Sequence, residues 1–175
     1  GVVVYTRVNA ENGATVQGVN FELNASPSAR FQIQSGFTIQ KSEFEEPQEF
    51  DEKRFFRSPG QYGYLSLNFS PSMLLNIAFT GNYTAPILVP YFGPLAANPE
   101  IGQLNTSSSF FDAGVKISYD VRLTEVIKMQ INAGTKNLFN SYQRDFDSGI
   151  NRDPAYIYGP TSPRMIYFGL KFGSF

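Results

Sequence analysis

The strongest constraint on this fold is an alternation of apolar and polar side chains that recurs along most of the chain. The alternation is clear in segments 15–25, 62–69, 111–120 and 165–173. A two-residue period places apolar side chains on one face of a strand and polar side chains on the other. No apolar run approaches the roughly 18 residues that a membrane-spanning helix needs. The sequence therefore predicts an all-β, antiparallel fold.

We predict eight strands, joined alternately by short turns and long loops. The strands are placed at 2–8, 15–25, 31–40, 62–69, 75–83, 111–120, 127–136 and 165–175. Short turns are expected at 26–29, 70–72 and 122–124, and long loops at 42–58, 87–107 and 138–163. Pro90, Pro94 and Pro99 are expected to exclude regular structure from the second loop. Because the connections alternate, all three long loops should lie at one end of the sheet.

The chemistry of the two faces favours a transmembrane β-barrel segment. Charged side chains within the strands fall on the polar face and should line the lumen: Glu22, Asp112, Lys116, Asp120, Lys128, Lys136 and Lys171. Aromatic side chains gather near strand ends: Phe31, Phe69, Tyr83, Phe110, Phe111 and Tyr119. Barrels that cross membranes show these features, with an apolar outer surface, a polar interior and aromatic girdles at both interfaces.

Two other folds share this periodicity. A soluble sandwich or ligand-binding barrel would turn the apolar face inward, and alternation alone does not distinguish inside from outside. A complete eight-stranded outer-membrane protein with a structural or adhesive role is the second alternative. Several glycines on the polar face would fill such a narrow lumen poorly: Gly18, Gly36, Gly114, Gly134 and Gly169.

The amino-acid composition limits the kinds of catalytic and binding site that we expect. The chain has neither His nor Cys, which removes the commonest general base and thiolate ligands, so we expect no enzyme, no cofactor and no metal centre. The net charge of −1 gives no basic field for nucleic acid. The start at Gly1, directly followed by a run of valines, leads us to expect a fragment of a longer protein.

The end of the chain carries a more specific pattern. Lys136-Asn137-Leu138-Phe139-Asn140, followed by Tyr142, resembles the signature that precedes the last strand of TonB-dependent outer-membrane receptors. Pro163-Arg164 and the strand after it are similar to the closing strand of that family. Segments 14–22 and 55–64 also resemble late barrel strands of such receptors. The resemblance is to receptors from gut-type Bacteroidetes.

The resemblance implies the last third of a 22-stranded barrel in the cell outer membrane. Residues 1–175 would form a single C-terminal barrel portion, without the plug domain and the earlier strands. The implied partners are outer-membrane lipid, the plug and through it TonB, a nutrient ligand and a surface lipoprotein. The terminal Phe175 falls on the face of Lys171, and a bulge at 173–174 would restore the outward phase that the family usually shows. Exposed strand edges should make the isolated chain close on itself or pair with a second copy.

Candidate ligand contacts lie in the long loops. Their aromatic side chains offer contact area to a nutrient, or else they pack the loops together: Tyr91, Phe92, Phe139, Tyr142, Phe146, Tyr156 and Tyr158. Asp145, Asp147 and Asp153, with Asn151, offer oxygen ligands to Ca²⁺, although a solvated turn explains this incomplete pattern better. The acidic segment 43–52 suits a cationic ligand or a simple soluble loop.

Overall fold

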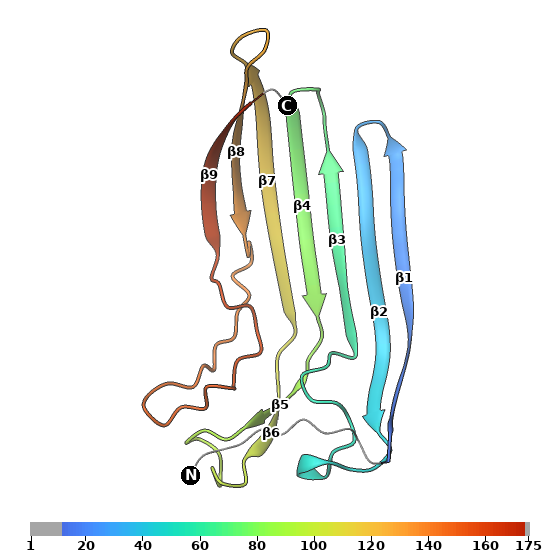
Figure 1. The fold of residues 1–175 in the computed structure, drawn as a ribbon, viewed down its shortest axis with the longest axis vertical. Helices are drawn as coiled ribbons and strands as arrows, with labels where there is room; N and C mark the ends of the chain where they lie inside the picture. Colours follow the sequence, from blue (N-terminus) through green and yellow to red (C-terminus); the bar gives the residue numbers. More distant parts are fainter. Residues whose placement is uncertain (1–11, 174–175) are drawn as a thin grey trace.

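The chain forms one long antiparallel sheet in a computed structural model that describes residues 12–173. Seven strands are hydrogen-bonded in the order β1-β2-β3-β4-β7-β8-β9 (Figure 1). Their bounds are β1 Ala14–Ser28, β2 Phe31–Phe44, β3 Gln61–Phe69, β4 Leu75–Thr84, β7 Phe110–Arg122, β8 Lys128–Lys136 and β9 Met165–Gly173. The predicted all-β, antiparallel fold is confirmed. The strand predicted over 2–8 lies outside the described residues.

Apolar residues face apolar residues across every strand pair of this sheet. Ile33 lies opposite Leu67, and Ile131 lies opposite Leu170. The same match holds in the other pairs: Val19↔Ile39, Leu67↔Phe79, Ile77↔Ile117 and Tyr119↔Ile131. A slip of one residue would turn a strand's apolar side chains to the opposite face, so this match fixes the register.

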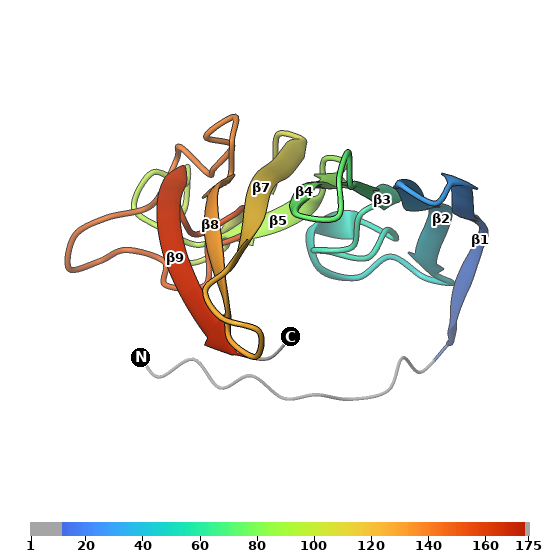
Figure 2. The ribbon, with the colours of Figure 1, turned by 90° about the horizontal axis from the view of Figure 1, so that it is seen from above.

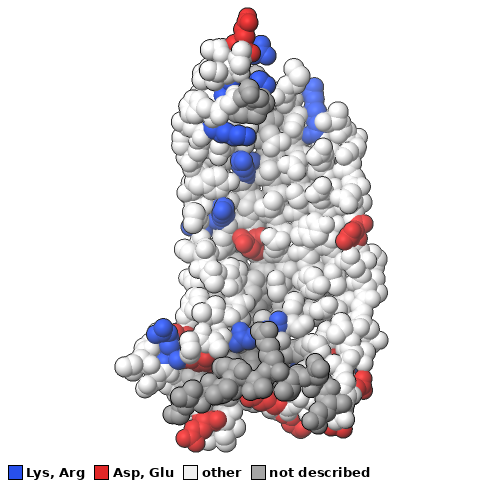
Figure 3. All heavy atoms as spheres, viewed as in Figure 1, with Lys and Arg blue, Asp and Glu red and all other residues white. Residues whose placement is uncertain are grey.

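The sheet curves, and its two faces differ in polarity. Figure 2 shows the strands forming an arc when viewed from above, with the concave side toward the viewer of Figure 1. Figure 3 shows that concave side, where Lys, Arg, Asp and Glu side chains lie over the strands. The apolar side chains occupy the other face and are open; Phe168, for example, is 68% exposed. This is the reverse of the soluble alternative, in which the apolar face would be covered.

All long connections lie at one end of the sheet, as predicted. Figure 1 shows them at its lower end, with the short turns after β1, β3 and β7 at the upper end. The described residues contain no helix that is long and apolar enough to cross a membrane.

The prediction that prolines exclude regular structure from 87–107 was wrong. Leu88–Tyr91 (β5) and Gln103–Thr106 (β6) form a two-stranded sheet in which Pro90 lies opposite Leu104. The Ser107 N–H donates to the Ile87 carbonyl, and hydrogen-bonded pairs alternate along an antiparallel ladder. Pro90 therefore falls in a non-hydrogen-bonded pair, where its missing N–H costs nothing.

Two predicted boundaries also differ from the structure. The turn expected at 26–29 is shorter, because β1 continues to Ser28 and pairs there with Phe31. The register shifts between Ala25 and Ser28, so Pro27 sits in a bulge, where a strand tolerates proline. The loop expected from 42 begins later, since β2 runs to Phe44, and it contains a short 3-10 helix, Glu49–Asp51.

The sheet is open over residues 12–173. In this part of the chain β1 pairs only with β2, and β9 pairs only with β8. This open arrangement counts against the expectation that the isolated chain closes on itself, while pairing with a second copy stays a prediction. Phe175 and the proposed bulge at 173–174 reach beyond the described residues.

Candidate ligand-binding loops and their anchors

The three long connections pack into one structure at the loop end. We name them loop A (residues 45–60), loop B (85–109) and loop C (137–164). Loops B and C share an apolar core that consists of Ile87, Val89, Tyr91, Ala96 and Tyr156. The rings of Tyr91 and Tyr156 have centroids 4.6 Å apart, and the two residues are only 4% and 5% exposed. Tyr91 and Tyr156, two of the candidate ligand contacts, thus hold loops B and C together. This supports the alternative that the aromatic side chains pack the loops against each other.

A carboxylate that accepts hydrogen bonds from two tyrosine hydroxyls organises loop C. Tyr158 Oη donates to Asp145 Oδ1 at 2.5 Å, and Tyr156 Oη donates to Asp145 Oδ2 at 3.0 Å. Burial raises the pKa of both tyrosines, and their hydrogen bonds to Asp145 raise it further. Burial by itself would raise the pKa of Asp145 too, but the hydrogen bonds from Tyr158 and Tyr156 outweigh it and lower that pKa.

The other loop aspartates bind backbone N–H groups. Asp147 Oδ2 accepts from the Asp153 N–H at 2.7 Å, and Asp153 Oδ2 accepts from the Phe92 N–H at 3.0 Å. These bonds fold loop C and tie it to loop B. The described part of the chain has no group of three or more His, Cys, Asp or Glu side chains that could hold a metal ion. The carboxylates weighed for Ca²⁺ are therefore not gathered into a ligand set.

Arg57 connects loop A to both other loops, and sequence reasoning missed it. Its guanidinium donates to the carbonyls of Ala155 at 2.6 Å and Ile157 at 3.0 Å, both in loop C. Its backbone N–H donates to the carbonyl of Leu88 in β5 at 2.8 Å. One planar, five-donor side chain can meet two carbonyls at once. No local pattern around Arg57 indicates partners that lie about 100 residues away.

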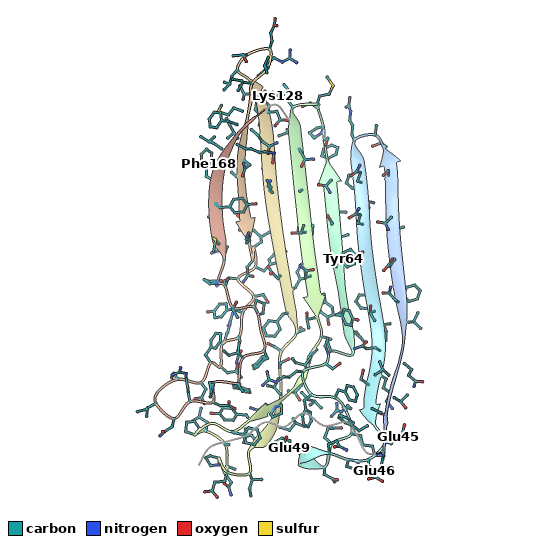
Figure 4. All side chains as sticks on the ribbon, viewed as in Figure 1. Glu45, Glu46, Glu49, Tyr64, Lys128 and Phe168 are labelled. Carbon is teal, nitrogen blue, oxygen red and sulfur yellow. The ribbon has the colours of Figure 1, made fainter. Side chains whose placement is uncertain are left out.

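The acidic segment of loop A is stabilised from within the loop. Figure 4 shows Glu45, Glu46 and Glu49 at the loop end of the sheet. Arg54 forms a 2.6 Å ion pair with Glu52, and Lys53 donates to the Glu45 carbonyl at 2.8 Å. The Arg54 hydrogen bond is the main reason that the pKa of Glu52 falls to about 2. The acidic segment is therefore an ordered loop that is exposed to solvent.

The motif that precedes the last strand forms the base of loop C. Asn137 is only 3% exposed and has a φ of 47°, in the left-handed region that asparagine tolerates. Its side-chain nitrogen donates to the carbonyls of Ser141 at 2.9 Å and Ser162 at 2.8 Å. Its side-chain oxygen accepts from the Ser141 N–H at 2.7 Å. One amide side chain thus joins the beginning and the end of the loop.

The neighbouring motif residues extend this base. Asn140 Oδ1 accepts from the Arg164 N–H at 3.0 Å, which fixes the chain next to Pro163 just before β9. The Leu138 N–H donates to the Ala113 carbonyl of β7 at 2.7 Å. Phe139, in contrast, is 63% exposed and stacks on Phe111, with ring centroids 5.8 Å apart. The motif therefore combines loop anchoring with one outward aromatic side chain.

The concave face carries polar side chains and tyrosines lying over glycines. Tyr64, labelled in Figure 4, pairs with Gly36, where an added Cβ would come within 2.5 Å of the ring. Gly134 and Tyr167 have the same relationship between β8 and β9. A shallow hollow of about 530 Å³ marks this face at β1–β4, with Glu22 and Tyr64 in its lining. The predicted luminal charges occupy strand positions on this polar face.

One girdle assignment was wrong. Phe110 was expected at the membrane interface, but it is buried and its ring lies 6.0 Å from that of Tyr158 in the loop core. Neighbouring side chains of a strand point to opposite faces, so Phe111 occupies the outer surface while Phe110 points into the loops. Phe31 and Phe69 meet edge to face near the turn end, and the remaining girdle assignments stay predictions.

Comparisons with known proteins identify the fold. No family model matches the chain, and no curated protein matches it. Among solved structures, the chain is similar to the ferric-catecholate import receptor Fiu of E. coli K12 (TM-score 0.65, 18% identity, covering 93% of this chain and 21% of the receptor). It is also similar to the ferripyoverdine receptor of the outer membrane of Pseudomonas aeruginosa (0.62, 14%, 93% and 20%). The ferric enterobactin receptor PfeA of the same organism is a third neighbour (0.59, 19%, 93% and 22%).

These neighbours share the fold of the barrel wall of TonB-dependent outer-membrane receptors. The chain spans about a fifth of their length. The predicted fold class, a segment of such a barrel, is confirmed.

Proposed function

We propose that the chain is part of an outer-membrane receptor for the TonB-dependent active uptake of a nutrient. The observation that carries this proposal is one curved sheet with an open apolar outer face, a charged concave face and three long loops gathered at one end. A lipid-exposed barrel wall requires this combination. The fold shared with receptor barrels supports it.

The contribution of residues 1–175 would be a single C-terminal portion of the barrel: wall, luminal surface and three outer loops. The concave face would contact a plug domain contributed by another part of the receptor, and TonB would act through that plug. In this proposal outer-membrane lipid surrounds the apolar face. A surface lipoprotein is the further partner to test at the loop end.

The nutrient would meet the loops first. We propose that Tyr91, Tyr156 and Asp147 act by holding the shape of the loop surface, since their side chains are engaged within it. Asp145 is exposed although it accepts hydrogen bonds from Tyr156 and Tyr158, and Phe92 and Tyr158 are half-buried; we propose these three for direct contact. The structural neighbours are named as receptors for ferric catecholate, ferripyoverdine and ferric enterobactin. For this chain we propose only the general class of ligand, a nutrient that porins do not admit.

Membrane fractionation and uptake test this proposal together. We expect the protein in the outer-membrane fraction, and we expect deletion of its gene to abolish growth on one limiting nutrient from a panel of iron chelates, cobalamins, oligosaccharides and peptides. Deletion of TonB should abolish the same growth. Protein in the soluble fraction would contradict the barrel, and growth that persists without TonB would contradict active uptake.

A further inference from the structure

A groove lies where the apolar outer face of the sheet meets the base of loop C. Its volume is about 770 Å³, and its lining includes Tyr83, Phe111, Phe139, Asn140, Tyr142 and Arg144. Tyr83 and Phe111 are opposite each other in β4 and β7, at the loop end of those strands. The groove therefore sits at the outer boundary of the apolar band.

One side of the groove is apolar and continues the open outer face. Phe111 lies on the same face as Ile117 and packs close to Gly81, where an added Cβ would come within 2.9 Å of its ring. Phe139 stacks on Phe111 with an interplanar angle of 28° and leaves most of its own surface open. These two stacked rings, both partly exposed, present an apolar surface to an acyl chain.

The other side of the groove carries a positive charge. The Arg144 guanidinium lies 5.9 Å from the centre of the Tyr142 ring, which holds it against the groove wall. Between residues 12 and 173 Arg144 forms no ion pair. The next residue, Asp145, stays charged but directs its two carboxylate oxygens to the hydroxyls of Tyr156 and Tyr158, and it forms no ion pair with Arg144 in the described residues. Asn140 and Ser141 add polar groups at the same wall.

We propose that this groove is a binding site for an anionic lipid of the outer leaflet. The phosphate of its headgroup would lie at Arg144, and an acyl chain would lie along Phe111 and Phe139. Arginine and phosphate form short, charge-assisted hydrogen bonds with matching geometry. The apolar surface of the groove is continuous with the face that we assign to lipid, which argues for an occupant from the membrane. The inference rests on the proposed outer-membrane location.

Native mass spectrometry of the detergent-solubilised protein, titrated with phosphatidylglycerol or phosphatidylcholine, tests the site. We expect the net-negative phosphatidylglycerol to bind more tightly, and Arg144→Gln to weaken it about tenfold, the effect of losing one charge-assisted contact. Phe139→Ala should also weaken it. Arg152→Gln is the matched control, since Arg152 is an exposed arginine of the same loop that lies outside this groove.

The outcomes separate this site from the proposed function. Equal binding by Arg144→Gln and Arg152→Gln, or no preference between the two lipids, would overturn the site while leaving the receptor proposal intact. Displacement of the lipid by inorganic phosphate alone would show a plain anion site and overturn the lipid assignment. Fractionation of the unaltered protein comes first, because its absence from the outer membrane would overturn both proposals.

Discussion

The side-chain amide of Asn137 donates a 2.8 Å hydrogen bond to the backbone carbonyl of Ser162, 25 residues further along the chain. This bond joins the beginning and the end of loop C, the longest of the three loops, at the loop end of the sheet. The same side chain also holds both the N–H and the carbonyl of Ser141. Asn137 thus holds the two ends of loop C together from a buried position.

Replacement of Asn137 with alanine should release loop C. The change removes three hydrogen bonds from a buried position and leaves a non-glycine residue at positive φ, so we expect a loss of about 2–3 kcal/mol in unfolding free energy. Limited proteolysis should cut loop C faster, and urea unfolding should show the loss. Asn151→Ala, at an exposed position in the same loop, is the control. Equal cleavage of both variants would contradict this role.

Arg57→Lys should uncouple loop A from loop C while keeping the charge. A single ammonium group lacks the planar fork that reaches the carbonyls of Ala155 and Ile157 together. We expect local opening of residues 155–158 to increase about tenfold, as for loss of one hydrogen bond of a charged group. Hydrogen exchange of those amides measures it, and Arg152→Lys in the same loop serves as the control. Unchanged exchange would mean that the tyrosine core holds loop C without Arg57.

Lowering the pH should destabilise the folded conformation of loop C, because Asp145 becomes protonated. The pKa of Asp145 is lowered in the folded protein, so the stability it contributes is present above its ordinary pKa of 3.8 and is lost as pH falls through the folded pKa. We expect faster exchange of the loop C amides in this acid range. Asp145→Asn should remove that acid dependence, and Tyr158→Phe should reduce it. An acid response that persists in Asp145→Asn would assign it to another group.

Lysine substitutions at adjacent positions of β1 test which face meets lipid. Leu23 belongs to the open apolar face and Asn24 to the polar face, so Leu23→Lys should place a charge in the bilayer and Asn24→Lys should not. For a site near the bilayer midplane the expected cost is about 2–4 kcal/mol, less toward the interface. Insertion into lipid vesicles, followed by the unfolding midpoint in urea, measures the difference. Greater damage from Asn24→Lys would reverse the assigned faces.

Much of the sheet follows from short stretches of sequence. The two-residue period assigned Phe21, Ile77 and Leu170 to one face without any knowledge of their partners, because the pleat is a local property of the backbone. The alternation of short and long connections likewise placed all three loops at one end. The motif at 137–140 indicated the approach to the last strand.

Contacts between segments far apart in the sequence could not be predicted from such local patterns. Pro90 entered a strand because its partner across the ladder, Leu104, needs no hydrogen bond from it. Tyr91 became buried only because Tyr156, far along the chain, packs against it. The bond between Arg57 and Ala155 spans 98 residues.

The sequence by itself therefore determined the class of fold, the two faces of the sheet and the end that carries the loops, since each depends on a repeat of a few residues. The tertiary structure alone decided which loop residues are buried, which aspartates bind backbone and where Arg144 meets the apolar band. These arrangements depend on loops that the sheet brings together across long sequence separations, and on competition among several possible partners for each polar group.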